Sequence, residues 1–463
     1  MMAVTPHRVR QVNDEHFCPT GAKAVDQVKN THFRSLLGPL FGEADGMVGA
    51  MTRRRVVLLT SLYPWGPGEE FIAPELHHWV RDDVELTILP WQSTELRRPV
   101  PEGIVVDDRL DRLRRSGWRL ALAGQLFSGR FWAEAARSVR AGKAAPRTLW
   151  RALVPSAAAG LTERALADLA ASRGPFDVAY SYWFDHQTLG ALAAARRGHV
   201  RRVVSRAHGY DLYEERSPDG RLPFRREMAR RVSLLAPISS TGLQYVRHRY
   251  AAPESTSACH RLGVTIPDGC SPCPADLATV RLLSISSTHP VKRLPALVET
   301  VAEIARLLPG STISWTHAGS GDALPELAGL ASELLPPNAK VDWLGQLSRE
   351  ELNETILGSA WNLALNTSSS EGVPISLMEA MAGGIPVAAT AVGGTPELIS
   401  PPGGLLLPPD DPPARWAAEI VEALPRTCDP SWRAGFREEI LSNWDEARNH
   451  QRFIRAVLAT CET

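Results

Sequence analysis

The chain has 463 residues, a length that suggests two to four domains. Hydrophobic residues make up 44% and charged residues 22%, which is an ordinary globular composition. Lys and Arg total 51, as do Asp and Glu, and phosphate binding along a nucleic acid needs an excess of cations, so we exclude a nucleic-acid partner. No apolar run approaches the roughly 20 residues that span a bilayer, and the N-terminus lacks an apolar signal core. We therefore expect a cytoplasmic protein.

Short apolar runs alternate with helical patterns along most of the chain. In the first half the predicted strands are 56–60, 84–90, 176–181 and 200–207, with helices up to about residue 172 and over 188–197. In the second half the predicted strands are 280–284, 311–317, 341–344, 361–365 and 385–390, with helices over 294–308, 350–357 and 374–382. Such alternation predicts an α/β fold of two Rossmann-like domains that face each other across a cleft.

A segment rich in Pro, Cys and Gly separates the two halves. Residues 265–276 have little periodicity, which is typical of a linker. Cys270 and Cys273 form a C-x-x-C pair with Cys259 nearby, and zinc uses such cysteines. The second half of a four-ligand pattern is missing, however, and prolines crowd the pair. We interpret the segment as a linker and expect no bound metal.

The most informative segment runs from Ser368 to Val387 and joins a Ser-rich loop to a helix. Pro374 suits the first helical position, and Gly383 or Gly384 suits the C-terminal cap. Free amides at a helix start attract anions, so a diphosphate would fit there. Glu371 in the loop and Glu379 on the helix could accept hydrogen bonds from sugar hydroxyls. The alternative is a surface helix with two solvated glutamates.

This segment resembles a known signature. Residues 371–399, EGVPISLMEAMAGGIPVAATAVGGTPELI, are similar to the Glu-x7-Glu motif of family-4 retaining glycosyltransferases, which have the GT-B fold. Residues 282–293 and 313–321 resemble the phosphate loop and glycine turn of that family. Residues 60–72 and 206–213 are similar to its bacterial exopolysaccharide-type subgroup. Together the resemblance spans residues 56 to about 455.

The resemblance implies roles for individual residues. Glu379 would hold the ribose of the nucleotide, Glu371 would face the donor sugar, and Lys292 would neutralise the diphosphate. The other residues that it assigns to the donor site are Gly372, Val373, Pro374, Ile375, Arg293 and Gly319. His208 would lie beside the transferred sugar. The sequence departs from the family at Ser287, where most members carry Arg, and Arg293 is the basic residue that appears instead.

Two further patterns bear on the reaction. Gly66 and Gly68 after the first strand would let a substrate approach the backbone closely, with Glu69 contacting the acceptor, although a simple turn remains the alternative. Gly319-x-Gly321 lacks the third glycine of a dinucleotide fingerprint, because Leu324 stands there. No D-x-D follows a strand, so we expect metal-independent transfer that needs no cofactor beyond the nucleotide-diphosphate sugar as co-substrate.

Residues 112–151 combine basic and aromatic side chains. Ten Lys or Arg residues accompany a single acid, Glu134, and Trp118, Phe127 and Trp132 lie among them. A basic helix with aromatic residues on one side can lie on an anionic membrane. The alternative is a solvated face over a core stripe. On the membrane interpretation, the protein would be peripheral at the inner face of the membrane.

The resemblance thus predicts a retaining hexosyltransferase of polysaccharide or natural-product biosynthesis. It would use a nucleotide-diphosphate sugar, with UDP-sugars favoured, and a glycan, lipid-linked or small-molecule acceptor. The alternatives are a non-catalytic nucleotide-sugar-binding partner, or an epimerase or hydrolase of the same fold. The expected parts are a poorly ordered extension (1–52), an acceptor-side domain (53–264), a linker (265–278), a nucleotide-sugar domain (279–445) and a helix packing back toward the first domain (446–463).

Overall fold

A computed structural model describes residues 53–66, 68–140 and 146–462. The extension expected over residues 1–52 lies outside these ranges. Residues beyond position 50 group into one unit, which contains two six-stranded sheets. All strand pairs of both sheets are parallel.

The N-terminal sheet has the strand order β3-β2-β1-β4-β5-β6. Its strands are β1 (Arg54–Thr60), β2 (Val84–Pro90), β3 (Val105–Val106), β4 (Phe176–Ser181), β5 (Val200–Ala207) and β6 (Leu234–Pro237). This is the Rossmann order, in which the winding direction reverses between the first and fourth strands. Ligands of such sheets bind where the carboxyl ends of those two strands meet, so β1 and β4 define one candidate edge.

The helices of this half are more broken than the sequence predicts. They are η1 (Glu70–Ile72), α1 (Ala73–His77), α2 (Arg109–Gly124), η2 (Gln125–Phe127), α3 (Gly129–Arg140), α4 (Pro146–Arg173), α5 (His186–Arg196), η3 (Glu214–Arg216), α6 (Arg225–Ala229), α7 (Ser240–Tyr250) and η4 (Glu254–Thr256). The helical stretch expected up to residue 172 is divided near Ser128, where the backbone becomes extended. Helix α5 starts two residues earlier than predicted, because the Asp185 side chain caps it by accepting from the Gln187 amide.

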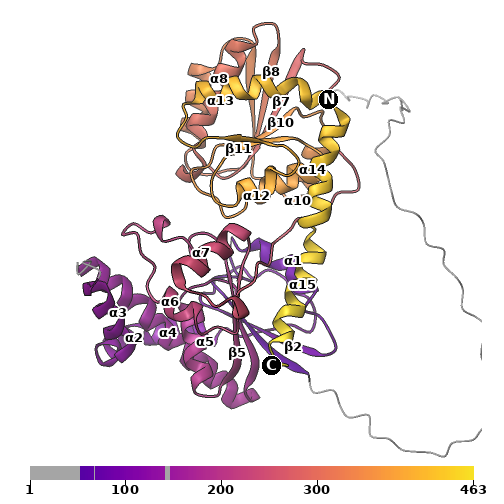
Figure 1. The fold of residues 1–463 in the computed structure, drawn as a ribbon. Coiled ribbons are helices and arrows are strands. Elements are labelled where there is room, and N and C mark those ends of the chain that lie inside the picture. The colour runs from indigo at the N-terminus through magenta and orange to yellow at the C-terminus, as the bar shows by residue number, and fades with distance from the viewer. Residues whose placement is uncertain (1–52, 67, 141–145, 463) are drawn as a thin grey trace, which may run out of the picture. The chain divides into compact units, whose positions relative to one another are not determined.

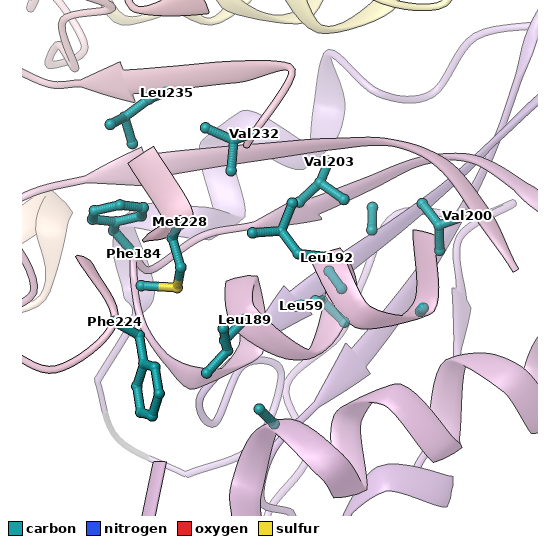
Figure 2. Close-up of a cluster of buried hydrophobic side chains, with 14 of the residues drawn as sticks. Leu59, Phe184, Leu189, Leu192, Val200, Val203, Phe224, Met228, Val232 and Leu235 are labelled. Carbon is teal, nitrogen blue, oxygen red and sulfur yellow. The ribbon is translucent and has the colours of Figure 1, made fainter. Parts of the chain in front are cut away.

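Apolar residues on both faces of the N-terminal sheet build its core. Val57 and Leu59 of β1 pack in one cluster with α4 and α5, whereas Val56 and Leu58 point to the opposite cluster. Figure 2 shows part of the first cluster, where side chains of strands, α5 and α6 meet. Each fully buried aliphatic side chain contributes about 1.5–3 kcal/mol to stability. Burial on both faces explains why these strands read as continuous apolar runs.

The C-terminal sheet repeats the same topology. Its order is β12-β11-β10-β7-β8-β9, which is the Rossmann order when counted from β7. Its strands are β7 (Thr279–Ile285), β8 (Thr312–Ala318), β9 (Ala339–Gly345), β10 (Leu363–Asn366), β11 (Val387–Thr390) and β12 (Leu405–Leu407). Its helices are η5 (Pro290–Lys292), α8 (Leu294–Leu307), α9 (Leu324–Leu334), α10 (Arg349–Leu357), α11 (Ile375–Ala382), α12 (Thr395–Ile399), α13 (Pro413–Ala423), η6 (Leu424–Cys428) and α14 (Pro430–Asn443). The winding direction reverses between β7 and β10.

Helix α11 differs from its prediction at the first residue. Pro374 was expected inside the helix, but its backbone is extended (φ −74°, ψ 107°) and it occupies the N-cap position. The helix therefore begins at Ile375. At the other end Gly383 is the C-cap, and Gly384 follows with φ 72°, a left-handed conformation that favours glycine.

Helix α15 (Glu446–Ala459) packs against the N-terminal sheet although it follows the C-terminal one (Figure 1). Phe453, Ile454, Val457 and Leu458 are buried there in the same cluster as Val56 of β1. The first domain is thus completed by the end of the chain. No helix of the described ranges is both long and apolar enough to cross a bilayer.

A carboxylate of the C-terminal half contacts the N-terminal half. Glu397 of α12 accepts from the amide of Ser240 (2.7 Å) and from its hydroxyl (3.0 Å) at the start of α7. The guanidinium of Arg261 donates to Glu397 Oε1 at 2.6 and 2.9 Å. These charge-assisted bonds connect the edges of the two sheets directly.

Candidate functional site

An ion pair occupies the edge where β7 and β10 reverse the winding of the C-terminal sheet. Glu371, five residues after the end of β10, accepts at Oε1 from Lys292 Nζ (2.7 Å) and Ser368 Oγ (2.7 Å). Asn366 Nδ2 donates to the same oxygen at 3.3 Å. The structure thus brings together two residues that the sequence predicts for the site. Their charges compensate each other, and the Glu371 carboxylate is held in place by three donors.

The loop that carries Lys292 is held against the loop that carries Glu371. His289 caps η5, since its Nδ1 lies 3.2 Å from the Val291 amide and accepts from it. The Val291 carbonyl accepts from the Ser369 amide at 2.8 Å, and the Lys292 carbonyl accepts from the Thr367 hydroxyl at 3.1 Å. These bonds fix the position of the Lys292 backbone relative to the ion pair.

Glycines allow the loops of this edge to approach closely. A Cβ at Gly393 would overlap the carbonyl oxygen of Glu371, and Gly393 has φ 56°. A Cβ at Gly319 would overlap the carbonyl oxygen of Ser286, and Gly319 has φ 143°. The sequence predicts Gly319 for donor binding. In the structure a glycine is needed at this position because the loops that follow β7 and β8 pack closely against each other.

The start of α11 presents unused hydrogen-bond donors. No side chain caps this helix, and the amides of Gly372, Val373 and Ile375 make no hydrogen bond to the described residues. The first amides of a helix carry partial positive charge from the helix dipole. This helix start can therefore bind an anion next to Lys292.

Glu379 lies farther along α11 and is partly buried. Burial raises the pKa of its carboxyl to about 7, Arg349 acts in the opposite direction, and Glu446 raises the pKa further. No hydrogen bond to the carboxyl group of Glu379 is found among the described residues, and its assignment to ribose hydroxyls stays a prediction.

Arg293 does not face this site. Its Nε donates to the Thr367 carbonyl (2.7 Å), its Nη1 donates to the Pro409 carbonyl (2.8 Å), and its guanidinium lies 5.1 Å from the centre of the Trp416 ring. The residue has φ 50°, which turns the chain at the start of α8. Two of its donors thus anchor the loop to its own domain, whereas Nη2 has no partner among the described residues, and donor binding by Arg293 stays a prediction.

His208 follows β5 at the edge of the N-terminal sheet. Its ring is stacked on Tyr182, with centroids 4.9 Å apart and an interplanar angle of 22°, and it lies 4.6 Å from the Trp183 ring. The side chain is buried, yet neither ring nitrogen has a hydrogen-bond partner in the described residues. An unpaired buried imidazole is costly unless a ligand supplies the missing bond.

Asp211 holds the backbone around His208 in place. Its Oδ1 accepts from the amides of His208 (2.9 Å) and Gly209 (3.0 Å), and its Oδ2 accepts from the Phe184 amide (2.9 Å). His208 Nδ1 lies 3.5 Å from Oδ2, which is longer than an ordinary hydrogen bond. Burial acts to raise the pKa of Asp211, but the contacts with His208 and the amides lower it on balance.

Glu69 also has a different role from the one predicted. Its carboxylate accepts from the amides of Ser61 (3.0 Å), Leu62 (2.6 Å) and Tyr63 (2.7 Å) and from the indole N–H of Trp183. With four donors bound it holds the loop after β1 in place, and little acceptor capacity is left for a substrate. Gly66 and Gly68 have φ 60° and 90°, and their carbonyls accept from Arg98.

A cavity of about 240 Å³ lies between the edges of the two sheets. Its lining residues are Phe71, Trp183, His208, Gly209, Tyr210, Arg216, Ile238, Leu262, Gly372, Val373 and Ile375. The sequence-based analysis finds His208 and the residues of the α11 loop but misses Phe71, Trp183, Tyr210 and Arg216. The run Tyr-Trp-Phe-Asp directly after β4 is the signal that could have revealed Trp183.

Among the described residues, no group of three or more His, Cys, Asp or Glu side chains could hold a metal ion.

The fold is GT-B, with two Rossmann-like sheets that meet at this cavity. Residues 279–425 match the family model described as "Glycosyl transferases group 1". The comparisons therefore show similarity to this family within the C-terminal domain alone. They leave open the subgroup within that class.

Relatives and solved structures agree with this fold. Over 227 residues the chain is 27% identical to a GDP-mannose-dependent alpha-(1-6)-phosphatidylinositol monomannoside mannosyltransferase of Mycolicibacterium smegmatis, covering 46% of this chain and 57% of the relative. The chain is 25% identical over 253 residues to a GDP-mannose-dependent monoacylated alpha-(1-6)-phosphatidylinositol monomannoside mannosyltransferase of Corynebacterium glutamicum. This match covers 50% of this chain and 63% of the relative. The matches therefore span less than two thirds of either relative.

The similarity to solved structures extends over most of the chain. The lipopolysaccharide outer core galactosyltransferase WaaB aligns with a TM-score of 0.63 and 15% identity, covering 88% of this chain and 99% of that one. Anabaena HepE in complex with UDP and glucose aligns with a TM-score of 0.58 and 15% identity, covering 88% and 100%. At this identity the similarity establishes the fold alone.

Proposed function

We propose that this protein transfers a sugar from a nucleotide-diphosphate donor to an acceptor hydroxyl with retention of configuration. The observation that carries the proposal is the Lys292–Glu371 ion pair beside the uncapped start of α11. Across the 240 Å³ cavity from this helix start lies His208, whose ring nitrogens have no partner. The cavity thus lies between the helix start proposed for the diphosphate and the imidazole proposed for the sugar.

In this proposal the donor binds mainly to the C-terminal domain. The amides of Gly372, Val373 and Ile375 and the ammonium group of Lys292 bind the diphosphate, and Glu379 accepts from the ribose hydroxyls. Negative charge grows on the leaving diphosphate in the transition state, so donors fixed in advance lower the barrier. These groups could serve without a divalent cation. Activity that survives a chelator in metal-free buffer would support metal independence, and loss restored by added cation would contradict it.

The proposal of retention rests on the resemblance of residues 371–399 to a retaining family. Glu371 accepts from three donors at Oε1, and Asp211 accepts from three amides, and we propose that neither acts as a nucleophile. We therefore propose attack on the face from which the diphosphate leaves. The bond between the anomeric carbon and the phosphate oxygen breaks, the acceptor oxygen bonds to that carbon, and the acceptor proton passes to the leaving phosphate. His208 orients the sugar. Proton NMR of the product tests this step, because an inverted anomer would overturn the proposal.

The donor base has two candidates. The sequence-based expectation favours UDP-sugars, and HepE was solved with UDP. Both curated relatives are named for GDP-mannose. A thermal-shift panel of UDP, GDP and dTDP sugars separates them, since a ligand that binds only the folded state raises the melting temperature in proportion to ln(1 + [L]/Kd).

For the acceptor we propose a lipid-linked molecule reached at a membrane surface. Large apolar side chains are exposed on α2, η2, α3 and α4, and Phe127 at the end of η2 is 92% exposed. The members of this exposed group are Leu120, Leu126, Phe127, Trp132, Val139 and Trp150. Exposed Arg119, Arg140 and Arg147 accompany them. An apolar group with cations around it fits an anionic membrane surface, and the names of both curated relatives include phosphatidylinositol.

Vesicle sedimentation tests the membrane contact. Binding to anionic vesicles should weaken as salt rises, because exposed charges are screened over roughly 8–10 Å at 0.1–0.15 M. The double variant Phe127→Ser with Trp132→Ser should bind much less than the parent protein. Leu96→Ser is the matched control, because Leu96 is 73% exposed outside this group. No binding of the parent protein even at low salt would contradict the contact.

A nucleotide-sugar-binding partner without turnover, and an epimerase or hydrolase of the same fold, remain as alternatives. Incubation with nucleotide sugars, with and without acceptor, separates them. Diphosphate released only with acceptor supports transfer, release without acceptor indicates hydrolysis, an isomerised donor indicates an epimerase, and an unchanged donor indicates a binding protein.

A further inference from the structure

Arg216, the last residue of η3, lines the cavity from the N-terminal side. Its guanidinium packs against the backbone of Gly209, where an added Cβ would overlap Nη1. It also lies 5.3 Å from the centre of the Tyr213 ring. Gly209 follows His208 directly, so the cation and the unpartnered imidazole lie on neighbouring parts of the same wall.

Arg216 has no direct acidic partner in the part of the chain that the structure describes. Within the described residues Arg216 forms no ion pair and its side chain makes no hydrogen bond, although it is partly buried. Burial lowers the pKa of the guanidinium, while the charges of Glu371 and Asp211 act to raise it. A partly buried guanidinium without an acceptor loses solvation that an anionic ligand would replace.

The cations near the start of α11 are engaged by groups of their own domain. Lys292 is paired with Glu371 at 2.7 Å, and Arg293 donates to the carbonyls of Thr367 and Pro409. A diphosphate on the start of α11 would thus meet one ammonium whose charge is already compensated. Arg216 lines the same cavity as Gly372, Val373 and Ile375 without such compensation.

We infer that Arg216 binds the diphosphate of the donor from the N-terminal side of the cavity. The inference rests on the proposed function and adds to it a phosphate-binding residue outside the C-terminal domain. When the bond between the anomeric carbon and the phosphate oxygen breaks, its electron pair stays on the diphosphate, and Arg216 stabilises that charge. The bound donor would then contact both halves of the protein.

Calorimetry with a nucleoside diphosphate and with its free nucleoside tests the inference. The base is the one that the parent protein binds in the thermal-shift panel. Arg216→Gln should weaken binding of the diphosphate about 10-fold to 100-fold, the range of a charge-assisted hydrogen bond. Binding of the nucleoside should change less than about two-fold, since it carries no phosphate. Arg226→Gln, at an exposed arginine of α6, is the matched control and should change neither.

Two further variants separate a lost contact from a damaged fold. Arg216→Lys keeps the charge and should recover part of the diphosphate affinity. Gly209→Ala keeps Arg216 but displaces its guanidinium, so it should also weaken diphosphate binding. Unchanged diphosphate affinity in Arg216→Gln overturns the inference, and so does an equal loss for nucleoside and diphosphate. A parent protein that binds no nucleoside diphosphate instead overturns the proposed function itself.

Discussion

The two sheets have the same strand order, but their carboxyl edges are built from different groups. At the edge of β7 and β10 the available donors are backbone amides at the start of α11 and the Lys292 ammonium. In the N-terminal half the cavity wall carries the rings of Phe71, Trp183, His208 and Tyr210 together with the Arg216 guanidinium. The strand order alone therefore predicts at which edge of a sheet a ligand binds. The kind of ligand depends on the side chains and amides at that edge.

Buried carboxylates also act differently at the two edges. Glu69 and Asp211 in the N-terminal half each accept several backbone amides and so shape the loops that carry the rings. Glu379 in the C-terminal half has no such partner, and burial raises its pKa. We interpret Glu69 and Asp211 as supports of the loops and Glu379 as a ligand-binding group. Four substitutions test this contrast.

His208→Ala should have the largest effect. On the proposed mechanism it removes the ring that orients the sugar in the transition state, so kcat should fall about 100-fold or more. Affinity for the nucleoside diphosphate should stay within about two-fold, because the ring faces the sugar. Steady-state kinetics and calorimetry measure the two quantities. His77→Ala, at an exposed histidine of α1, serves as control. A near-normal kcat would leave His208 as a packing residue.

Lys292→Ala should come next. Removing the ammonium takes a positive charge from the leaving diphosphate and leaves Glu371 unpaired, so KM for the donor should rise and kcat should fall. We expect kcat/KM to drop about 10-fold to 100-fold. Lys292→Arg should recover part of the activity. Lys340→Ala is the control, because Lys340 is an exposed lysine of β9. Full kcat/KM in Lys292→Ala would remove the phosphate role.

Glu379 should give a pH-dependent effect on binding. Ribose hydroxyls donate to the ionised carboxylate, so with a pKa of about 7 nucleotide affinity should rise between about pH 6 and pH 8. Glu379→Gln should flatten this rise, and Glu379→Ala should cost about 1.5–3 kcal/mol above pH 8. Calorimetry over this range measures both, with the exposed Glu354→Gln as control. A pH-independent parent affinity would contradict the assignment.

The same carboxyl affects stability in the opposite direction. Its pKa in the folded state is higher than the usual 4.5, so the folded state binds the proton more tightly than the unfolded state. Its contribution is present below about pH 4.5 and is lost as pH rises to about 7. Relative to the parent, Glu379→Gln should therefore gain stability with rising pH over that interval. Denaturant unfolding at several pH values measures the gain.

Glu397→Gln should have the smallest effect. It removes the negative charge that accepts from Ser240 and Arg261 of the N-terminal half. The free energy of unfolding should fall by about 1–2 kcal/mol. Calorimetric melting should show a reduction of a few degrees, while nucleotide affinity stays the same. A loss of affinity as large as that of Lys292→Ala would mean that the two edges do not act independently.

The sequence predicts most strands but misses β3, β6 and β12. Apolar runs such as 56–60 and 200–207 are long enough to reveal buried strands. In contrast β3 and β12 have two and three residues and carry too little pattern, and the four residues of β6 are missed although β10 and β11, which are equally short, are predicted. Their presence depends on pairing with neighbouring strands, which is a property of the assembled sheet. The sheet order itself is likewise fixed by contacts between segments far apart in the chain.

The candidate site could be predicted only where a continuous motif carries it. Lys292 and Glu371 meet because their motifs follow neighbouring strands. The motif does not predict how the side chain of Arg293 is directed, because Arg293 itself has a left-handed backbone (φ 50°) and its Nη1 donates to the Pro409 carbonyl. Glu69 was misassigned because a carboxylate in a glycine loop can face either a ligand or its own backbone amides, and composition does not distinguish these.

Helix α15 has a consequence for how the chain is made. An N-terminal domain ordinarily folds first during synthesis. Here Phe453, Ile454, Val457 and Leu458 cover Val56 and its neighbours, so that part of the first core has to wait for α15. All strands of the second sheet, which ends with β12, precede α15 in the sequence. The apolar face of β1 thus stays uncovered until the strands of both sheets have been made.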